Sequence, residues 1–139
     1  MKRKPPVHYS DRPLAAKLGL QAGMRAAALD APAHYLRLLA PVPAGLMLAN
    51  SLDRRMDFIH VFATKRAQLA RRLTVILKRL NADGILWISW PKRSSAVATD
   101  LDENIIRALG LAAGLVDVKV CAVDQTWSGL KFVYRLKDR

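Results

Sequence analysis

The sequence predicts an open, mostly parallel α/β sheet that ends in an antiparallel hairpin. Apolar segments that suit strands alternate with segments that suit helices, as in an open α/β fold. Residues 85–89 are apolar at nearly every position, which is typical of a central strand covered on both faces. Two strand-like segments, 116–123 and 130–136, are joined by a short polar loop containing Gly129, which favours a hairpin. Right-handed crossovers make the first five strands parallel and only the last antiparallel.

Length and composition favour one compact domain behind a basic arm. The chain has 139 residues, 52% of them hydrophobic, so it can bury a core without disulfide or metal staples. We expect residues 1–12 to form a mobile basic arm and residues 13–139 a single domain. The single cysteine, Cys121, excludes an intrachain disulfide and is consistent with a reducing cytoplasm. No apolar run is long enough to cross a membrane, and no secretion signal follows the basic start.

The first elements are predicted to be short. Residues 13–18 suit a helix because a proline stands at an early position and Gly19 follows the end. Residues 24–29 are rich in alanine and fit either a helix or a buried strand; we assign a strand because strands and helices alternate after them. The same patterns predict a helix over 34–39 and strands over 46–49 and 58–62.

Two longer, amphipathic helices follow. Thr64 can cap the first, in which apolar residues recur every three to four positions, and residues 81–84 end it. Asp100 can cap the second, and Glu103, three residues later, completes a capping box. We place the end of the second helix at Gly110 or Gly114.

The net charge of +12 is concentrated in the first 80 residues. They hold 15 basic and 4 acidic residues, or +11, against 8 and 7, or +1, in the rest. Such clustering is what phosphate binding requires, so a nucleic acid is one candidate partner. A solvated helix face explains the same pattern, and no stacking aromatic residues accompany it. The candidate nucleic-acid contacts are Lys65, Arg66, Arg71, Arg72, Lys78 and Arg79.

The order of elements looks like the methyltransferase-type Rossmann fold with one strand–helix pair missing after the second strand. Residues 83–92 are similar to the strand after the fourth helix of that superfamily. More closely, LWISWPK-SS at 86–95 and KVCAVDQTWSGLKFV at 119–133 resemble signatures of small bacterial proteins known only as a domain of unknown function. The resemblance implies a Rossmann-like fold and a bacterial cytoplasmic setting, without an established activity.

The sequence departs from this superfamily at the positions that bind the cofactor. The superfamily binds S-adenosylmethionine through a glycine-rich turn after its first strand and an acid at the end of its second. Here residues 29–33 contain no glycine, and Pro32 removes an N–H group. Asn50 and Ser51 stand where the acid is expected, with Asp53 two residues beyond. A degenerate methyltransferase is therefore an alternative, and we expect no cofactor.

Ligands of open α/β sheets bind beyond the carboxyl ends of the strands, where the strand order reverses. This rule brings polar and aromatic side chains from four strand ends to one rim. We expect a small anionic ligand, or an acidic segment of a partner protein, to bind there, with Trp90 and Trp127 as apolar walls and Lys92, Arg93 and serines as donors. The candidate ligand-binding residues are Asp30, Thr64, Trp90, Lys92, Ser94, Ser95, Asp124, Trp127 and Ser128.

No catalytic or metal site is expected. Cys121 lies in a strand without a nearby histidine, which suits a buried thiol. The three histidines lack metal-ligand spacing, and His60 suits a hydrogen-bonded core or interface residue. No nucleophile elbow or phosphate loop occurs. We therefore expect a non-catalytic binding domain, and a homodimer paired through a sheet edge remains open.

Overall fold

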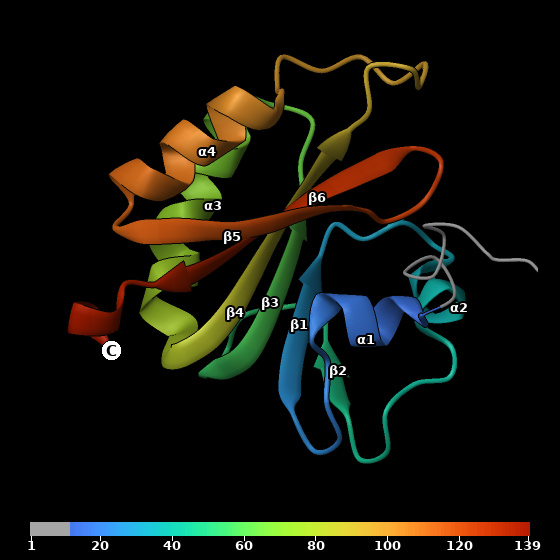
Figure 1. Cartoon of the computed structure of the whole chain (residues 1–139), viewed down its shortest axis with the longest axis vertical. Helices are drawn as coiled ribbons and strands as arrows, with labels where there is room; N and C mark the ends of the chain where they lie inside the picture. Colours follow the sequence, from blue (N-terminus) through green and yellow to red (C-terminus); the bar gives the residue numbers. More distant parts are fainter. Residues whose placement is uncertain (1–11) are drawn as a thin grey trace, which may run out of the picture.

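The computed structural model describes residues 12–139, which form a six-stranded sheet with helices on both faces (Figure 1). The predicted basic arm, residues 1–12, lies outside the described residues except for Arg12. The strands are β1 (Arg25–Leu29), β2 (Met47–Ala49), β3 (Met56–Phe62), β4 (Leu80–Pro91), β5 (Leu115–Ala122) and β6 (Trp127–Tyr134). The helices are α1 (Leu14–Leu18), α2 (Tyr35–Leu39), α3 (Arg66–Arg79) and α4 (Glu103–Ala112), and a 3-10 turn, Leu136–Asp138, follows β6.

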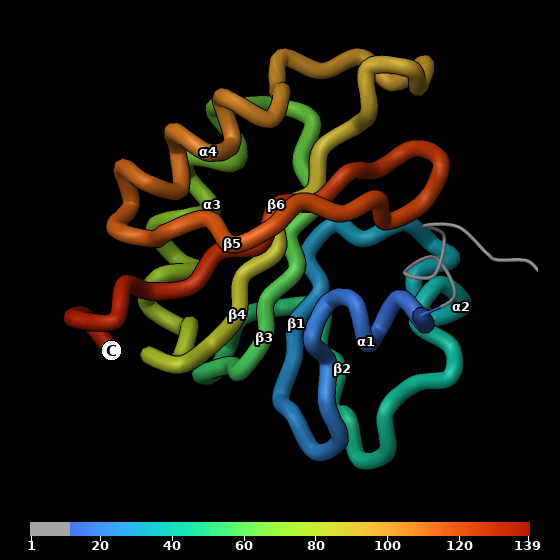
Figure 2. The backbone as a smooth tube through the Cα atoms, in the orientation of Figure 1, coloured from blue at the N-terminus to red at the C-terminus, as the bar shows by residue number. Residues whose placement is uncertain are grey.

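The predicted sheet is confirmed. Its order is β2-β1-β3-β4-β6-β5, and the pairs β1–β2, β1–β3 and β3–β4 are parallel. β6 is antiparallel to both β4 and β5, so β5 runs in the direction of the parallel strands. Figure 2 shows the resulting hairpin at one edge of the sheet and β2 at the other. The strand order reverses between β1 and β3, because the chain moves outward to β2 and then returns past β1.

Both faces of the central strands are covered. Ile59 and Val61 of β3 pack in the apolar cluster that contains the buried sides of α3 and α4. Phe58 and Phe62 of the same strand belong to the other cluster, which contains α1 and α2. Figure 1 shows these two helix pairs on opposite sides of the sheet. Successive side chains of a strand point to opposite faces of the sheet. Because both faces of the central strands are covered, these strands are apolar at consecutive positions.

The cap of α3 differs from the prediction. Thr64 does not cap α3; the residue before the helix is Lys65, whose side chain makes no capping bond. Asp100, predicted to cap α4, lies instead at the start of α3, where its Oδ1 accepts the amide of Arg66 at 2.7 Å. The Asp100 amide in turn donates to the carbonyl oxygen of Thr64 at 3.3 Å. Asp100 thus ties the approach to α4 onto the start of α3.

The predicted capping box at α4 is also wrong. The cap is Asp102, whose Oδ1 accepts the amide of Ile105 at 2.8 Å. Glu103 does not reach back to the cap; its carboxylate accepts a hydrogen bond from Arg107, one turn on, at 2.6 Å. Asp102 caps the helix because a side-chain oxygen at the residue before the first turn can accept the free amide three residues later.

The predicted stop at residues 81–84 is wrong as well. These residues belong to β4, which begins at Leu80 directly after α3. Gly84 makes this possible, since a Cβ there would lie 2.7 Å from the Leu80 side chain and 2.9 Å from the carbonyl oxygen of Asn81. At α4, Gly114 (φ 93°) follows the helix end as predicted, whereas Gly110 lies inside the helix against β6.

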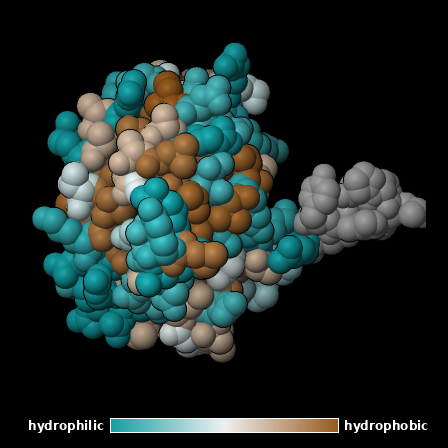
Figure 3. Space-filling model, turned by 60° about the vertical axis from the view of Figure 1, so that its left-hand side comes forward, coloured by the Kyte–Doolittle hydropathy of each residue, from teal (hydrophilic) through white to brown (hydrophobic). Residues whose placement is uncertain are grey.

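The outer edge of the hairpin is apolar in part. Figure 3 shows apolar residues grouped on the face turned forward, surrounded by hydrophilic ones. On β5 and α4, Val118, Val120 and Leu111 are exposed. The predicted homodimer stays a prediction, because a single chain is described. Within residues 12–139, no helix combines the length and apolarity needed to cross a membrane.

Candidate ligand-binding site

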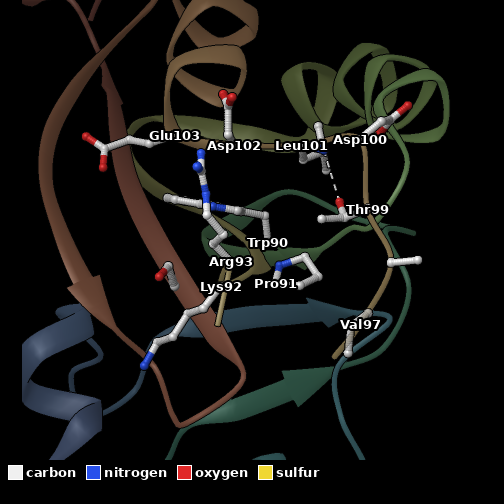
Figure 4. Close-up of a pocket in the computed structure, with 12 residues that line it drawn as sticks. Trp90, Pro91, Lys92, Arg93, Val97, Thr99, Asp100, Leu101, Asp102 and Glu103 are labelled. Atoms are coloured by element: carbon white, nitrogen blue, oxygen red, sulfur yellow. Dashed lines mark hydrogen bonds between the residues drawn. The ribbon is translucent and has the colours of Figure 1, made fainter. Parts of the chain in front are cut away.

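A hollow of about 670 Å³ opens at the carboxyl end of β4 (Figure 4). Its walls are the end of β4, the loop that follows, and the start of α4. Three of the predicted site residues line it: Trp90, Lys92 and Ser128. Trp90 and Ser128 lie directly opposite each other on β4 and β6, so the antiparallel pairing itself brings them together.

The hollow holds two cations and three carboxylates. Lys92 and Arg93 make no ion pair within residues 12–139. Figure 4 shows Arg93 extending toward the start of α4, whereas Lys92 extends in the opposite direction. The carboxylates of Asp100, Asp102 and Glu103 each accept a hydrogen bond described above, from the amides of α3 and α4 and from Arg107. Among residues 12–139, Lys92 and Arg93 thus lack an acidic partner, and of the three carboxylates only Glu103 has a cationic one, Arg107.

The loop after β4 is fixed by its own hydrogen bonds. The Lys92 amide donates to the carbonyl oxygen of Thr126 in the hairpin loop at 2.7 Å. Ser95 Oγ donates to the Lys92 carbonyl oxygen at 2.8 Å, so this hydroxyl stabilises the turn. Ser94 is exposed on the same turn. These contacts hold the backbone of Lys92 in place while its side chain stays free to bind.

Trp90 and Trp127 lie close together but do not face each other. Trp127 pairs with Pro91, the residue after Trp90, and neighbouring residues of a strand point to opposite faces. Trp90 is 6% exposed and packs on the α3 and α4 side. Trp127 packs edge-on against Phe62 on the other side, with ring centroids 5.1 Å apart. The two rings therefore cannot form the two walls of one pocket.

Asp124 shapes the hairpin loop. Its Oδ1 accepts the amides of Thr126 and Trp127, both at 2.8 Å. Its Oδ2 lies 3.0 Å from His34 Nε2. Burial alone would raise the pKa of Asp124, but these hydrogen bonds outweigh it and the pKa lies below its usual value. Asp124 joins the hairpin loop to the start of α2 and does not line the hollow.

The remaining two predicted residues lie at other strand ends. Asp30, which follows β1, has a left-handed backbone (φ 57°), and its carboxylate accepts a hydrogen bond from Arg72 at 2.6 Å. Thr64, after β3, accepts a hydrogen bond at its carbonyl oxygen from the Thr99 hydroxyl at 2.7 Å. Thr99 and Asp102 also line the hollow and were missed, because the loop reads as a cap sequence with no pattern that marks a pocket.

A buried polar chain crosses the α1 and α2 side of the sheet. His60 Nδ1 lies 2.8 Å from the hydroxyl of Tyr35, and His60 Nε2 lies 2.7 Å from Ser89 Oγ. All three residues are buried, and burial lowers the pKa of His60 to about 3. The expectation that His60 is a hydrogen-bonded core residue is confirmed.

A second hollow, of about 490 Å³, lies at the carboxyl ends of β1 and β2. Alanines dominate its lining, with Tyr35 and Asn50 as its polar groups. Asn50 stands at the end of β2, the position where the methyltransferase superfamily has its acid. Asp53 lines a different hollow, together with Arg25 and Arg54.

The predicted basic cluster is divided by the fold. Arg71 and Lys78 are exposed on the outer side of α3, opposite its buried residues. Arg72 pairs with Asp30 and is only half-exposed. In residues 12–139, no three His, Cys, Asp or Glu side chains are grouped so that they could hold a metal ion.

The sequence matches no family model and no curated protein. Its fold is similar to those of solved methyltransferases. The mitomycin 7-O-methyltransferase MmcR superposes with a TM-score of 0.64 at 10% identity, over 81% of this chain and 49% of that chain. A SAM-dependent methyltransferase from Aquifex aeolicus superposes with a TM-score of 0.58 at 16% identity, over 94% and 98%. ChlM from Synechocystis, a magnesium protoporphyrin IX methyltransferase solved with bound SAH, gives 0.58 at 9% identity, over 88% and 78%.

These likenesses show the fold: the chain is an α/β domain of the methyltransferase-like Rossmann class. It spans about half the length of MmcR and of LepI, which was solved in complex with SAM. The predicted fold class is thus confirmed. The bacterial family of unknown function stays a resemblance.

Proposed function

We propose that this protein is a non-catalytic binding domain that holds a small anionic molecule in the hollow at the end of β4. One observation carries the proposal. Lys92 and Arg93 line that hollow, and neither pairs with an acid of the described chain. A ligand carboxylate would supply the missing counter-charge, and Ser128 offers it a hydroxyl.

The carboxylates of the hollow limit the ligand's charge. Glu103 is paired with Arg107, and Asp100 and Asp102 balance the two positive charges, so the hollow offers a polyphosphate no net positive charge. A monoanion that also carries a hydrogen-bond donor fits better, because its donor can face the start of α4. We therefore propose a small carboxylate with an amino or hydroxyl group, bound by a bacterial cytoplasmic protein.

Fluorescence and calorimetric titrations with glycine, glutamate, succinate and ATP test this proposal. We expect an amino or hydroxy carboxylate to bind and ATP to bind least. The variants Lys92→Gln and Arg93→Gln should each weaken binding about tenfold, as expected for one charge-assisted hydrogen bond. Lys137→Gln, an exposed cation after β6, is the matched control and should leave it unchanged.

Equal affinities of a small carboxylate for wild type and the three variants would contradict the proposal. If small carboxylates fail but an acidic peptide binds with the same dependence on Lys92 and Arg93, the site takes a partner's acidic segment instead. Native mass spectrometry of the purified chain would then show a protein partner, or a second copy, in place of a small molecule.

A degenerate methyltransferase is the second candidate. Its support is the hollow at the ends of β1 and β2 together with neighbours that were solved with SAM or SAH. Against it, the turn after β1 lacks glycine, and Asp30 of that turn is engaged with Arg72. Calorimetry with S-adenosylmethionine separates the candidates. Heat that disappears on substitution Ala31→Trp, which fills the hollow, would favour the methyltransferase; absence of heat at millimolar ligand would remove it.

A further inference from the structure

A further hollow, of about 550 Å³, lies on β5 beside α1. It borders the β4 hollow at Ser128, which lines both. Lys17 of α1 and Lys119 of β5 stand at its walls, with Arg12 at the start of the described chain. Val120, Cys121 and Ala122 line the part between these cations. The hollow therefore combines basic groups with an apolar strand segment.

The strand pairing places like charges opposite each other here. Lys119 of β5 lies directly across from Lys131 of β6, so both side chains leave the same face of the hairpin. Like charges in directly opposite positions destabilise an antiparallel pair. Lys131 also reaches toward α1: its Nζ lies 3.9 Å from where a Cβ on Gly19 would stand. Three lysines thus converge from α1, β5 and β6.

The three lysines have no acidic partner in the described part of the chain. Burial, with a smaller contribution from Lys119, lowers the pKa of Lys131 below its usual value. Lys17 and Lys119 line the hollow, and Lys131 lies across from Lys119 without lining it. Folding alone gives no reason to gather these three cations. A bound anion gives one, because it would remove their mutual repulsion.

We propose that this hollow binds an amphipathic anion, with the acidic group held by Lys17 and Lys119, near Lys131, and the apolar body lying along Cys121 and the edge of β5. The volume lies within the range of small-molecule sites. A bare inorganic anion would leave the apolar segment uncovered, and an uncharged apolar molecule would leave the lysines unpaired. The ligand class is therefore an aliphatic or aromatic carboxylate or phosphate ester, distinct from the polar carboxylate proposed for the β4 hollow.

Cys121 provides a direct reporter of occupancy. It is the single cysteine of the chain, it is half-buried, and it lines this hollow. Alkylation of Cys121 by iodoacetamide, followed by intact mass, measures whether the hollow is filled. We use octanoate as the probe, acetate as its charge without the apolar body, and 1-octanol as the apolar body without charge.

We expect octanoate, at about ten times its dissociation constant, to slow alkylation about tenfold, while acetate and 1-octanol at the same concentration change it little. The double variant Lys17→Gln/Lys119→Gln should lose this protection, and Lys137→Gln should keep it. The ratio of the rates with iodoacetate and iodoacetamide gives a second readout. It should fall in the double variant, because the anionic reagent gains from the lysines and the neutral one does not.

The ratio of the two rates also separates the electrostatic attraction of the reagent from the reactivity of the Cys121 thiol. Burial raises the pKa of the Cys121 thiol, and Lys17 and Lys119 oppose that rise. Their removal therefore slows both reagents through the thiolate, but only a cationic hollow changes the ratio. Unslowed alkylation in both millimolar octanoate and millimolar octyl phosphate, or equal protection in wild type and double variant, would overturn the proposal. If octyl phosphate protects and octanoate does not, the phosphate ester is the ligand class. Titrations at the β4 hollow are unaffected by either result.

Discussion

His60 Nε2 lies 2.7 Å from Ser89 Oγ, and this bond joins the two central strands of the sheet diagonally. The other ring nitrogen bonds the Tyr35 hydroxyl at 2.8 Å, so both nitrogens have partners within the core. Gly129 stands opposite Ser89 on β6, where a Cβ would lie 3.2 Å from Ser89 Oγ and 3.0 Å from the Trp87 ring. Because Gly129 has no side chain, Ser89 and the Trp87 ring can lie this close to its backbone.

The first prediction is a loss of stability in mild acid caused by His60. Its pKa is about 3 in the folded protein and 6.5 when exposed. Between these pH values the unfolded chain binds a proton that the folded chain does not. The free energy of unfolding should therefore fall as the pH is lowered, by about 1.4 kcal/mol per pH unit, and be fully present above the unfolded-state pKa. Urea titrations at several pH values measure this slope.

The variant His60→Gln is the control for this slope. It keeps polar atoms beside Tyr35 and Ser89 but does not titrate, so its stability should depend less steeply on pH over the same range. It should also be less stable than wild type at neutral pH, since hydrogen bonds to both partners are disturbed. Identical slopes in the two proteins would show that His60 is not the titrating group.

The alternation of strands and helices was predictable because it depends on local apolar pattern. The run 85–89 needs cover on both faces, and only a central strand supplies it. The convergence of strand ends was also predictable, and Trp90 and Trp127 do lie on adjacent strands. Which face each ring takes was not, since it depends on a register between β4 and β6 that neither segment encodes alone.

The helix caps were mispredicted for a related reason. Asp100 fits the local pattern of a cap for α4, but its partner is the amide of Arg66, 34 residues earlier. The hollow itself arises from this crossing, because the loop must run from β4 over to the start of α3 before α4 begins. Contacts of this kind between distant segments leave no periodic signal in the sequence.

The second prediction concerns these caps. Asp100→Ala and Asp102→Ala should each reduce the free energy of unfolding by about 1 kcal/mol, because each removes an acceptor from a helix's first amides. Asp100→Asn should keep most of the stability, since an asparagine can accept the same bond. Denaturant titrations measure the three variants.

A double-mutant cycle then distinguishes this arrangement from a capping box. In the structure Asp100 serves α3 and Glu103 pairs with Arg107, so the effects of Asp100→Ala and Glu103→Ala should add. A capping box at α4 would instead couple the two side chains. Coupling of about 1 kcal/mol would contradict the observed bonds.

The third prediction addresses the basic face of α3. If nucleic acid binds there, affinity should fall steeply with salt, and Arg71→Gln and Lys78→Gln should each reduce the magnitude of the logarithmic slope by about 1. Arg72→Gln should change the slope less, because Asp30 already neutralises Arg72. Fluorescence anisotropy with a labelled duplex at several salt concentrations measures these slopes. No binding at low salt would leave α3 as a solvated helix face.

The fourth prediction concerns the close packing of α4 on β6 at Gly110. A Cβ on Gly110 would lie 2.1 Å from Cε1 and 2.4 Å from Cζ of Phe132, whose ring is fully buried. Alanine usually improves a helix interior by about 1 kcal/mol, but here overpacking should outweigh that gain. We expect Gly110→Ala to destabilise the protein by about 1–3 kcal/mol in thermal or urea unfolding.

The ring of Phe132 provides the test of this cause. In a Phe132→Leu background the smaller side chain leaves room for the new methyl group, so Gly110→Ala should cost at least about 1 kcal/mol less there than in wild type. Ala108→Gly, at an exposed position of the same helix, measures propensity alone and should cost about 1 kcal/mol in both backgrounds. If Gly110→Ala costs the same with either residue at 132, contact with the ring is not what requires glycine, and the separation of α4 from β6 is set elsewhere along their interface.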